Sequence, residues 1–235
     1  MQRLFDIVLS ALAILVLSPL LLPLVIALRL SGEGEIFYRQ RRVGIGARPF
    51  DLLKFATMLK NSPNLGAGNI TVKGDPRILP MGQFLRKTKI NELPQLFNIL
   101  RGDMSIIGPR PMTPDNFLTY SPDVQAAIAT VRPGLSGIGS IVFRDEEDML
   151  DHAAGDPRHV HANVIGPYKG ALEQWYVAHQ SLWTYLALIG LTAFTVLRPQ
   201  SRLVWTLFPS LPTPLPDMQS LFDTVSAAHG PPAAR

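Results

Sequence analysis

The feature that most constrains this chain is an uncharged apolar run near its N-terminus. Residues 7–28 contain no charged side chain and are bounded by Asp6 and Arg29. As a helix, this run would be about 33 Å long, close to the thickness of a bilayer's hydrocarbon core. It is too long for the apolar part of a signal peptide, and no small-residue cleavage motif follows it. A buried helix of a soluble protein is rarely apolar on every face. The sequence therefore predicts an N-terminal membrane helix.

Two prolines, Pro19 and Pro23, interrupt this run. Each removes a backbone donor and crowds the preceding turn, so we expect a kink there, with Ser18 supplying a partner for a freed carbonyl. Basic residues lie on both sides of the run. That placement favours a re-entrant hairpin that enters and leaves by the same face, although a straight span stays open.

The composition is typical of a membrane-associated protein. Only 17% of the residues are charged, and the mean hydropathy is +0.17. The chain has no Cys, which excludes a disulfide framework and a Cys nucleophile. Residues 1–110 carry a net charge of +8 and residues 111–235 a net charge of −4. A basic first half without a Lys/Arg-rich tail favours phosphate ligands and anionic lipid over nucleic acid.

The middle of the chain predicts short elements and a phosphate-binding region. Patterning predicts strands at 36–38 and 49–53 and helices at 81–86 and 92–100, with Asn91 as N-cap of the second helix and Gly102 ending it. Arg86 lies just before that helix, and Arg110 follows a Gly-Pro turn, so both suit phosphate oxygens. Glu92 suits Mg²⁺ or phosphoryl transfer. Each of these residues also has a purely structural interpretation. The arginines could belong to a solvated surface, and Glu92 could be a carboxylate that stabilises the first turn of its helix.

Several long motifs carry a resemblance to a known family. They lie at residues 3–6, 18–19, 36–40, 54–55, 75–77, 85–88, 92–96, 102–111, 132–134 and 175–177. Through them the chain resembles the bacterial sugar transferases, the monotopic polyprenyl-phosphate phosphoglycosyl transferases, over about residues 2–200. The resemblance implies an α+β fold that is mostly helical with a small β element. It also implies a re-entrant helix broken at Ser-Pro that holds the catalytic domain on the cytoplasmic face of the bacterial inner membrane.

The resemblance also implies a reaction and its partners. Family members transfer a phosphosugar from a nucleotide diphosphosugar, usually a UDP-sugar, to polyprenyl (undecaprenyl) phosphate and release UMP. An Asp-Glu dyad acts with Mg²⁺, and its Asp forms a phosphosugar-enzyme intermediate. Carried onto this chain, the resemblance gives Glu92 and Asn91 as catalytic residues, with Glu92 as the metal ligand. The residues expected to bind substrate are Lys54, Arg86, Asp103, Arg110 and Glu173.

The chain departs from the family at the dyad, where it has Asn91-Glu92. A neutral amide is a poor phosphoryl nucleophile. Four hypotheses stay open. In the first, Glu92 attacks the phosphorus, and in the second the lipid phosphate attacks it directly, with Glu92 holding Mg²⁺ and Asn91 orienting a phosphate oxygen. In the third, Asp103 takes part, and in the fourth the protein is a catalytically silent relative that binds ligands as a scaffold. Ala56 and residues 135–140 also depart from the family pattern and bear on the choice of sugar or nucleotide.

The rest of the chain gives weaker predictions. Glu173 has the alternative of a surface carboxylate, and His152, His159 and His161 match no usual zinc spacing. A second uncharged run, residues 177–197, suits an interfacial helix better than a span. A Pro-rich tail after residue 208 predicts extended, largely disordered chain. We expect three parts: a membrane helix (1–32), a catalytic domain (33–205) and a tail (206–235). A homo-oligomer stays open.

Overall fold

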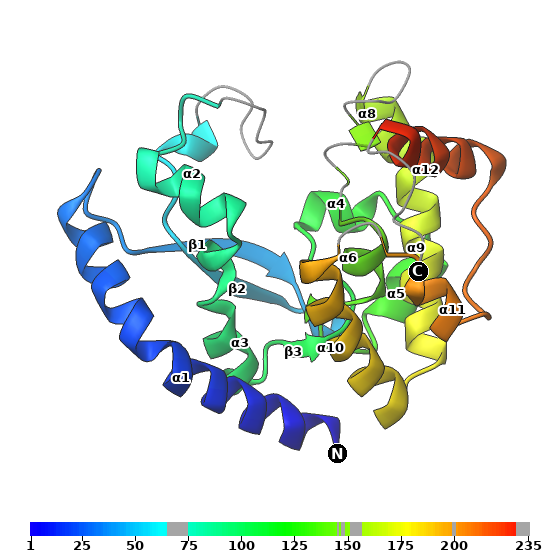
Figure 1. Ribbon diagram of the computed structural model, residues 1–235, viewed down its shortest axis with the longest axis horizontal. Helices are drawn as coiled ribbons and strands as arrows, with labels where there is room; N and C mark the ends of the chain where they lie inside the picture. The colour runs from blue at the N-terminus through cyan, green and yellow to red at the C-terminus, as the bar shows by residue number, and fades with distance from the viewer. Residues whose placement is uncertain (65–74, 145, 147–148, 151–156, 199–200, 229–235) are drawn as a thin grey trace. The chain divides into compact units, whose positions relative to one another are not determined.

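A computed structural model describes residues 1–64, 75–144, 146, 149–150, 157–198 and 201–228. The chain forms two compact units. The first, here called the α1 unit, contains residues 3–42 and 50–103. The second, here called the α9 unit, contains residues 1–2, 43–49 and 104–235. The described elements are mostly helices with two small sheets, which confirms that part of the predicted fold class (Figure 1).

Helix α1, Gln2–Leu30, contains the whole apolar run and continues through both prolines (Figure 1). The Ser18 hydroxyl donates to the Leu15 carbonyl at 2.7 Å. That carbonyl lies four residues before Pro19, which has no N–H to give it, so the serine replaces the missing bond as the sequence predicts. Among the described helices, α1 alone has the length and hydropathy needed to cross a bilayer. Membrane insertion, the kink and re-entry stay predictions.

Two contacts attach α1 to the rest of its unit. Near its C-terminal end, Leu28 packs with Phe55 and Leu85 in a buried apolar cluster. At its N-terminal end, the Arg3 guanidinium donates to the carbonyls of Ile99 and Leu100, the latter at 2.8 Å. These carbonyls belong to the last turn of α3, Gln95–Arg101, where helix carbonyls lack partners within the helix. Both ends of α1 are therefore anchored in the α1 unit.

A hairpin and short helices complete the α1 unit. Strands β1, Phe37–Val43, and β2, Pro49–Phe55, pair through a turn in which Gly46 has φ of 66°. The strands are longer than predicted, so Arg41 and Arg42 lie in β1. Helix α2, Pro80–Lys87, the 3-10 turn η3, Ile90–Glu92, and α3 follow. The buried Asn98 amide donates to the Asp51 carbonyl at 2.8 Å and accepts from the Leu53 N–H at 2.9 Å, which joins α3 to β2.

The α9 unit contains a parallel strand pair. β3, Ser105–Ile107, pairs with β4, Gly134–Ser136, and the connection carries helices α4, Pro114–Leu118, and α5, Pro122–Ile128. The Gly108-Pro-Arg-Pro turn follows β3. A Cβ added to Gly108 would lie 2.4 Å from the Arg132 carbonyl oxygen. Only glycine therefore lets the two family motifs, 102–111 and 132–134, approach this closely.

Helices make up the remainder of the α9 unit. Leu172, Ile165 and Leu188 are fully buried in it. The Tyr176 hydroxyl donates to the Ile107 carbonyl at 3.1 Å, which fixes α9 against β3. The further described elements are η2 (Ser62–Asn64) of the α1 unit, η1 (Ile45–Ala47), α6 (Ile138–Val142), α8 (Pro157–Val160), the π-helical turn η4 (His161–Ile165), α9 (Gly166–Ala178), α10 (Leu182–Leu197), α11 (Leu203–Leu207) and α12 (Pro216–Ala228).

Three predictions need correction. The predicted N-cap Asn91 lies inside η3, and α3 begins after Pro94 without a side-chain cap, because Pro94 breaks the chain into two short helices. The expected disordered tail was wrong for residues 216–228, which form α12 and bury Met218 and Leu221. The run 177–197 is not one helix, since it is broken between α9 and α10 and Ser181 caps α10 through the Thr184 N–H.

Candidate phosphate-binding site

The α1 unit contains a pocket of about 350 Å³ whose walls come from β1, β2, the segment that follows β2, α2 and η3. This volume lies within the range of about 300–1,000 Å³ that small-molecule sites occupy. Among the charged residues of the described lining, five are basic and one, Glu35, is a carboxylate. The basic lining residues are Arg39, Arg42, Lys54, Lys60 and Arg86. Such a pocket attracts anionic ligands because its charges share a partly enclosed space.

Lys54 and Glu92 form the central ion pair of this region. The Lys54 ammonium lies 3.1 Å from the Glu92 Oε1, and the two side chains are 18% and 20% exposed. β2 supplies Lys54 and η3 supplies Glu92, so the pair joins residues 38 positions apart. A partly buried pair is screened less by water and salt than a surface pair. The predicted catalytic carboxylate is therefore held by a fixed cation.

Asn91 lies beside this ion pair and lines the pocket. Its side chain is 6% exposed, and its Oδ1 has no hydrogen-bond partner among the described residues. A buried carbonyl oxygen without a partner costs about 1–3 kcal/mol. A ligand in the pocket that donates a hydrogen bond, or a cation, would satisfy this atom.

Arg86 comes from the last turn of α2 and is half-buried in the pocket wall. Within the described part of the chain, neither Arg86 nor Arg39 has a carboxylate within ion-pair distance, whereas Lys60 pairs with Glu35 at 2.7 Å. The predicted residues Lys54, Arg86 and Asn91 thus share one pocket. Because no carboxylate of the described chain lies within ion-pair distance of Arg86 or Arg39, the pocket suits an anion with more than one negative charge.

Asp103 contacts a residue of α3. Its Oδ2 accepts a hydrogen bond from the Asn98 Nδ2 at 3.2 Å, and it is not among the described residues that line the pocket. Asn98 is the residue that joins α3 to β2, so this carboxylate supports that contact. A direct substrate contact by Asp103 stays a prediction.

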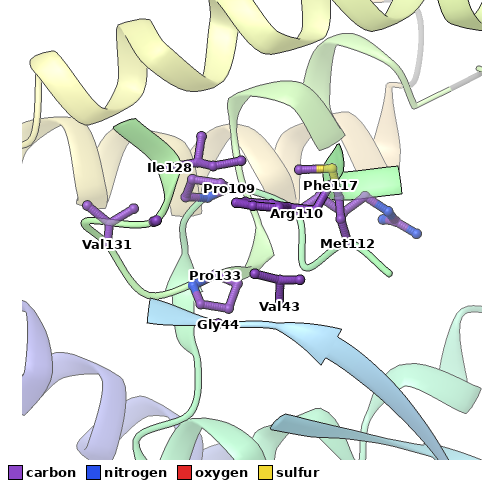
Figure 2. A pocket seen from close by; sticks show the side chains of 10 residues that line it. Val43, Gly44, Pro109, Arg110, Met112, Phe117, Ile128, Val131 and Pro133 are labelled. Atoms are coloured by element: carbon purple, nitrogen blue, oxygen red, sulfur yellow. The ribbon is translucent and has the colours of Figure 1, made fainter. Parts of the chain in front are cut away.

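Arg110 belongs to the α9 unit. Its stem lines a pocket of about 20 Å³, which holds little more than one water molecule. Figure 2 shows its guanidinium directed away from the apolar lining residues, and the side chain is exposed. Arg110 is therefore available to a phosphate through its exposed end, on a turn that Pro109 and Pro111 make rigid.

Glu173 is buried in the α9 unit, so the alternative of a surface carboxylate was wrong. The Arg110 backbone N–H donates to its Oε1 at 3.5 Å, a long contact, and its Oε2 has no partner among the described residues. A Cβ on Gly139 would lie 2.5 Å from the same Oε1. Burial raises the pKa of Glu173 to about 7, partly offset by the Arg110 N–H and by the charges of Lys169 and Arg110.

Metal binding can be tested against the oxygen atoms present. The described residues contain no group of three His, Cys, Asp or Glu that could hold a metal ion. His152 lies outside the described residues, and His161 instead contacts Glu146 at 3.3 Å. Mg²⁺ commonly takes one or two protein oxygens, with waters and substrate phosphates completing its coordination. The Glu92 carboxylate and the unpartnered Asn91 Oδ1 come from adjacent residues and fit that requirement.

Comparison with known proteins gives the protein family of this chain. The model of the bacterial sugar transferase family matches residues 1–199. The chain therefore belongs to the bacterial sugar transferase family.

Curated relatives support this assignment. An undecaprenyl-phosphate galactose phosphotransferase of Salmonella typhimurium is 33% identical over 212 residues, covering 84% of this chain and 40% of that protein. An uncharacterized sugar transferase of Haemophilus influenzae is 35% identical, covering 84% of this chain and 41% of that protein. The exopolysaccharide production protein ExoY of Sinorhizobium fredii is 35% identical, covering 68% of this chain and 76% of that protein. The chain thus spans about two fifths of the length of the first two.

The pocket residues that the sequence did not single out as ligands include Tyr38, Arg39, Arg42 and Lys60. The motif 36–40 contained the first two, but only as part of the resemblance. The signal that would have found the two arginines is the dense run of basic residues directly after the predicted strand at 36–38, namely Arg39, Arg41 and Arg42. Alternation along a strand places such charges on both faces, so the sequence does not say which of them meets a ligand.

Proposed function

We propose that this chain is a phosphoglycosyl transferase. It transfers a phosphosugar from a nucleotide diphosphosugar, most simply a UDP-sugar, to polyprenyl (undecaprenyl) phosphate and releases the nucleoside monophosphate. It works at the cytoplasmic face of the bacterial inner membrane, as the first membrane step in building a polysaccharide or glycoconjugate. Three relatives are named for undecaprenyl-phosphate sugar phosphotransfer with galactose or glucose, which supports this class of reaction.

One observation carries the proposal: the basic pocket shares a residue with the core that holds the apolar helix. Phe55 lines the pocket and also packs against Leu28 of α1. The outer face of α1 exposes large apolar side chains, including Leu15 at 70% and Val16 at 67%. If α1 enters the bilayer, the pocket is held near the lipid headgroups, where a lipid-borne phosphate lies. This arrangement suits an enzyme with one water-soluble and one membrane-bound anionic substrate.

The pocket residues divide the work of phosphoryl transfer. Arg86, with Arg39, neutralises the phosphates that must approach one another, and Lys54 holds Glu92 in position. Charge neutralisation and positioning supply most of the catalysis in such reactions. Glu92 and the Asn91 Oδ1 would hold Mg²⁺, which would supply further neutralisation of phosphate charge. Arg110 is not among the described residues that line this pocket; in the α9 unit, on its rigid turn, it would bind a phosphate with its exposed guanidinium.

The test uses the full chain in lipid nanodiscs with polyprenyl phosphate, Mg²⁺ and a panel of UDP-sugars. UMP release that requires both the lipid phosphate and a particular sugar nucleotide is the expected result. Arg86→Ala is expected to lower kcat/KM by about 100-fold, because one charge on the developing phosphates is lost. Arg41→Ala is the matched control, since Arg41 lies on β1 but does not line the pocket.

The alternative is a silent relative that binds ligands as a scaffold, and Asn91 in the dyad is the observation behind it. This alternative expects binding of a UDP-sugar by calorimetry without UMP release across the panel. Release of UMP at a rate proportional to the amount of protein, and lost in Glu92→Ala, would exclude it.

A further inference from the structure

We propose that the transfer occurs in a single displacement. The phosphate of the lipid acceptor attacks the sugar-linked phosphorus of the donor directly, and Asn91 binds and orients without becoming covalently attached. This inference rests on the proposed function and concerns the same pocket. Its basis is that the described pocket contains no free, activated nucleophile.

Asn91 itself cannot serve as the nucleophile. Its amide nitrogen lone pair is delocalised into the carbonyl, so the group forms hydrogen bonds but does not attack phosphorus as a carboxylate does. It lines the pocket at 6% exposure, and its Oδ1 has no partner in the described part of the chain. An oxygen in that position can accept a hydrogen bond from a sugar hydroxyl or bind a cation. The side chain therefore has the placement of a ligand-orienting group.

Glu92 is occupied by another contact. Its carboxylate is paired with Lys54 at 3.1 Å, and Glu92 is not among the described residues that line the pocket. To attack, the carboxylate would have to leave this partly buried pair and strand a cation, a costly change where water screens charges poorly. Glu92 therefore acts by holding Lys54 in position, and with the Asn91 Oδ1 it would hold a metal ion.

The other carboxylates are no better placed. Glu35 lines the pocket but pairs with Lys60 at 2.7 Å, and its hydrogen bond with Lys60 lowers its pKa, which weakens it as a nucleophile. Asp103 accepts a hydrogen bond from Asn98 outside the described lining. Both groups already have cationic or amide partners.

Hydroxyl groups remain, and they lack a base. The hydroxyls of Tyr38, Thr57 and Ser62 line the pocket, but no histidine is among its described lining residues. A hydroxyl attacks phosphorus only when a neighbouring base takes its proton. Residues 65–74, which follow Ser62 in the chain, contain no Asp, Glu, His or Cys. Among the described residues that line the pocket, a covalent relay therefore has no activated group.

Direct transfer balances without the enzyme as a reactant. An oxygen of the lipid phosphate forms a new P–O bond to the sugar-linked phosphorus of the donor. The bond from that phosphorus to the bridging oxygen breaks, and its electron pair leaves with the nucleoside monophosphate. No proton has to move. Both anions must be present together, which fits a pocket whose described lining has five basic residues and one carboxylate.

The mechanism is tested by isotope exchange and stereochemistry in the full chain in nanodiscs. An enzyme with a covalent intermediate moves labelled UMP into UDP-sugar without the lipid acceptor, whereas a direct transferase does not. We expect no exchange in the wild type, intersecting initial-velocity lines, and inversion at phosphorus with a chiral thiophosphate donor. Exchange at the turnover rate, retention, or a phosphosugar adduct found by mass spectrometry would overturn the inference.

Variants at position 91 give a second readout. Asn91→Asp restores a carboxylate, and we expect acceptor-independent exchange to rise at least about tenfold above background. Asn91→Ala should raise the donor KM, keep the intersecting pattern and show no exchange. Asn116→Asp is the matched control, because it adds the same charge to an exposed position of α4. No exchange in Asn91→Asp would overturn the assignment of position 91.

The same nanodisc samples report the overall reaction, through the lipid-linked product. Lipid product accompanied by exchange overturns the single displacement and leaves the proposed function standing. No lipid product in any variant overturns both.

Discussion

The ammonium of Lys54 and the carboxylate of Glu92 lie 3.1 Å apart, although 37 residues separate them in the chain. The exposed pair Arg41–Asp51 has the same 3.1 Å distance, but its side chains are 57% and 49% exposed. Burial therefore distinguishes two ion pairs of equal length, each of which takes its cation from the β1–β2 hairpin. The first lies beside the basic pocket, and the second is solvated.

This contrast predicts different effects of removing each cation. Lys54→Ala should lower kcat/KM for the sugar nucleotide by about 100-fold, because Glu92 then presents an unbalanced negative charge next to the anionic donor. Arg41→Ala should change it less than about twofold, since exposed pairs contribute about 0–1 kcal/mol. Steady-state UMP release measures both. Equal losses in the two variants would contradict the assignment of Lys54.

Asn98 predicts a stability effect. Its amide makes hydrogen bonds to Asp51 and Leu53 of β2 and is fully buried. Asn98→Leu leaves a strand N–H and a carbonyl without partners, which should lower the free energy of unfolding by about 2–4 kcal/mol. Denaturant titration in detergent measures this effect. Arg101→Ala, an exposed change on the same helix, should stay within about 0.5 kcal/mol. An unchanged midpoint in Asn98→Leu would contradict the role of this contact.

Arg3 predicts a local effect at the end of α3. Its guanidinium reaches the Ile99 and Leu100 carbonyls from the first turn of α1. Arg3→Ala removes a forked, charge-assisted contact at the negative end of the helix dipole, and should cost about 1–2 kcal/mol. Amide hydrogen exchange over residues 98–103 should become faster, while α2 keeps its protection. Arg3→Lys should restore only part of the exchange protection, because an ammonium lacks the planar fork of a guanidinium. Unchanged protection of residues 98–103 in Arg3→Ala would contradict the role of Arg3 at this helix end.

Glu173 predicts a pH dependence of stability. Burial raises its pKa to about 7 from an ordinary 4.5. Between these values the folded protein holds a proton that the unfolded chain has released. The free energy of unfolding should therefore fall as pH rises from about 4.5 to 7 and then level off. Glu173→Gln should remove a change of about 3 kcal/mol across this window.

Glu146 provides a control of opposite sign. Burial opposes its ionisation, but a hydrogen bond with His161 and the ion pair with Lys169 lower its pKa to about 2. Its stabilisation is present above about pH 4.5 and should be lost as pH falls toward 2. Glu146→Gln should flatten that acid limb only. Equilibrium unfolding at a series of pH values separates the two, and an identical profile for wild type and Glu173→Gln would contradict the shift in Glu173.

The sequence by itself determined the features that depend on neighbours in the chain. The apolar run became α1, the Ser18 hydroxyl reached the carbonyl that Pro19 leaves free, and Gly102 ends α3 with φ of 96°. Each follows from local backbone geometry and hydrogen bonding, which a short window of sequence specifies. The family motifs also identified Lys54, Arg86 and Asn91, which lie in one pocket.

Tertiary structure decided what those residues can do. The sequence assigned Asn91 to a helix cap, but packing buries it in the pocket wall with its Oδ1 unpartnered among the described residues. The tail looked disordered, yet residues 216–228 form a helix that buries Met218 and Leu221. Glu173 became a buried carboxyl beside Gly139. Burial, ion pairing and the pKa of a group depend on atoms distant in the chain, so a local pattern of residues does not contain them.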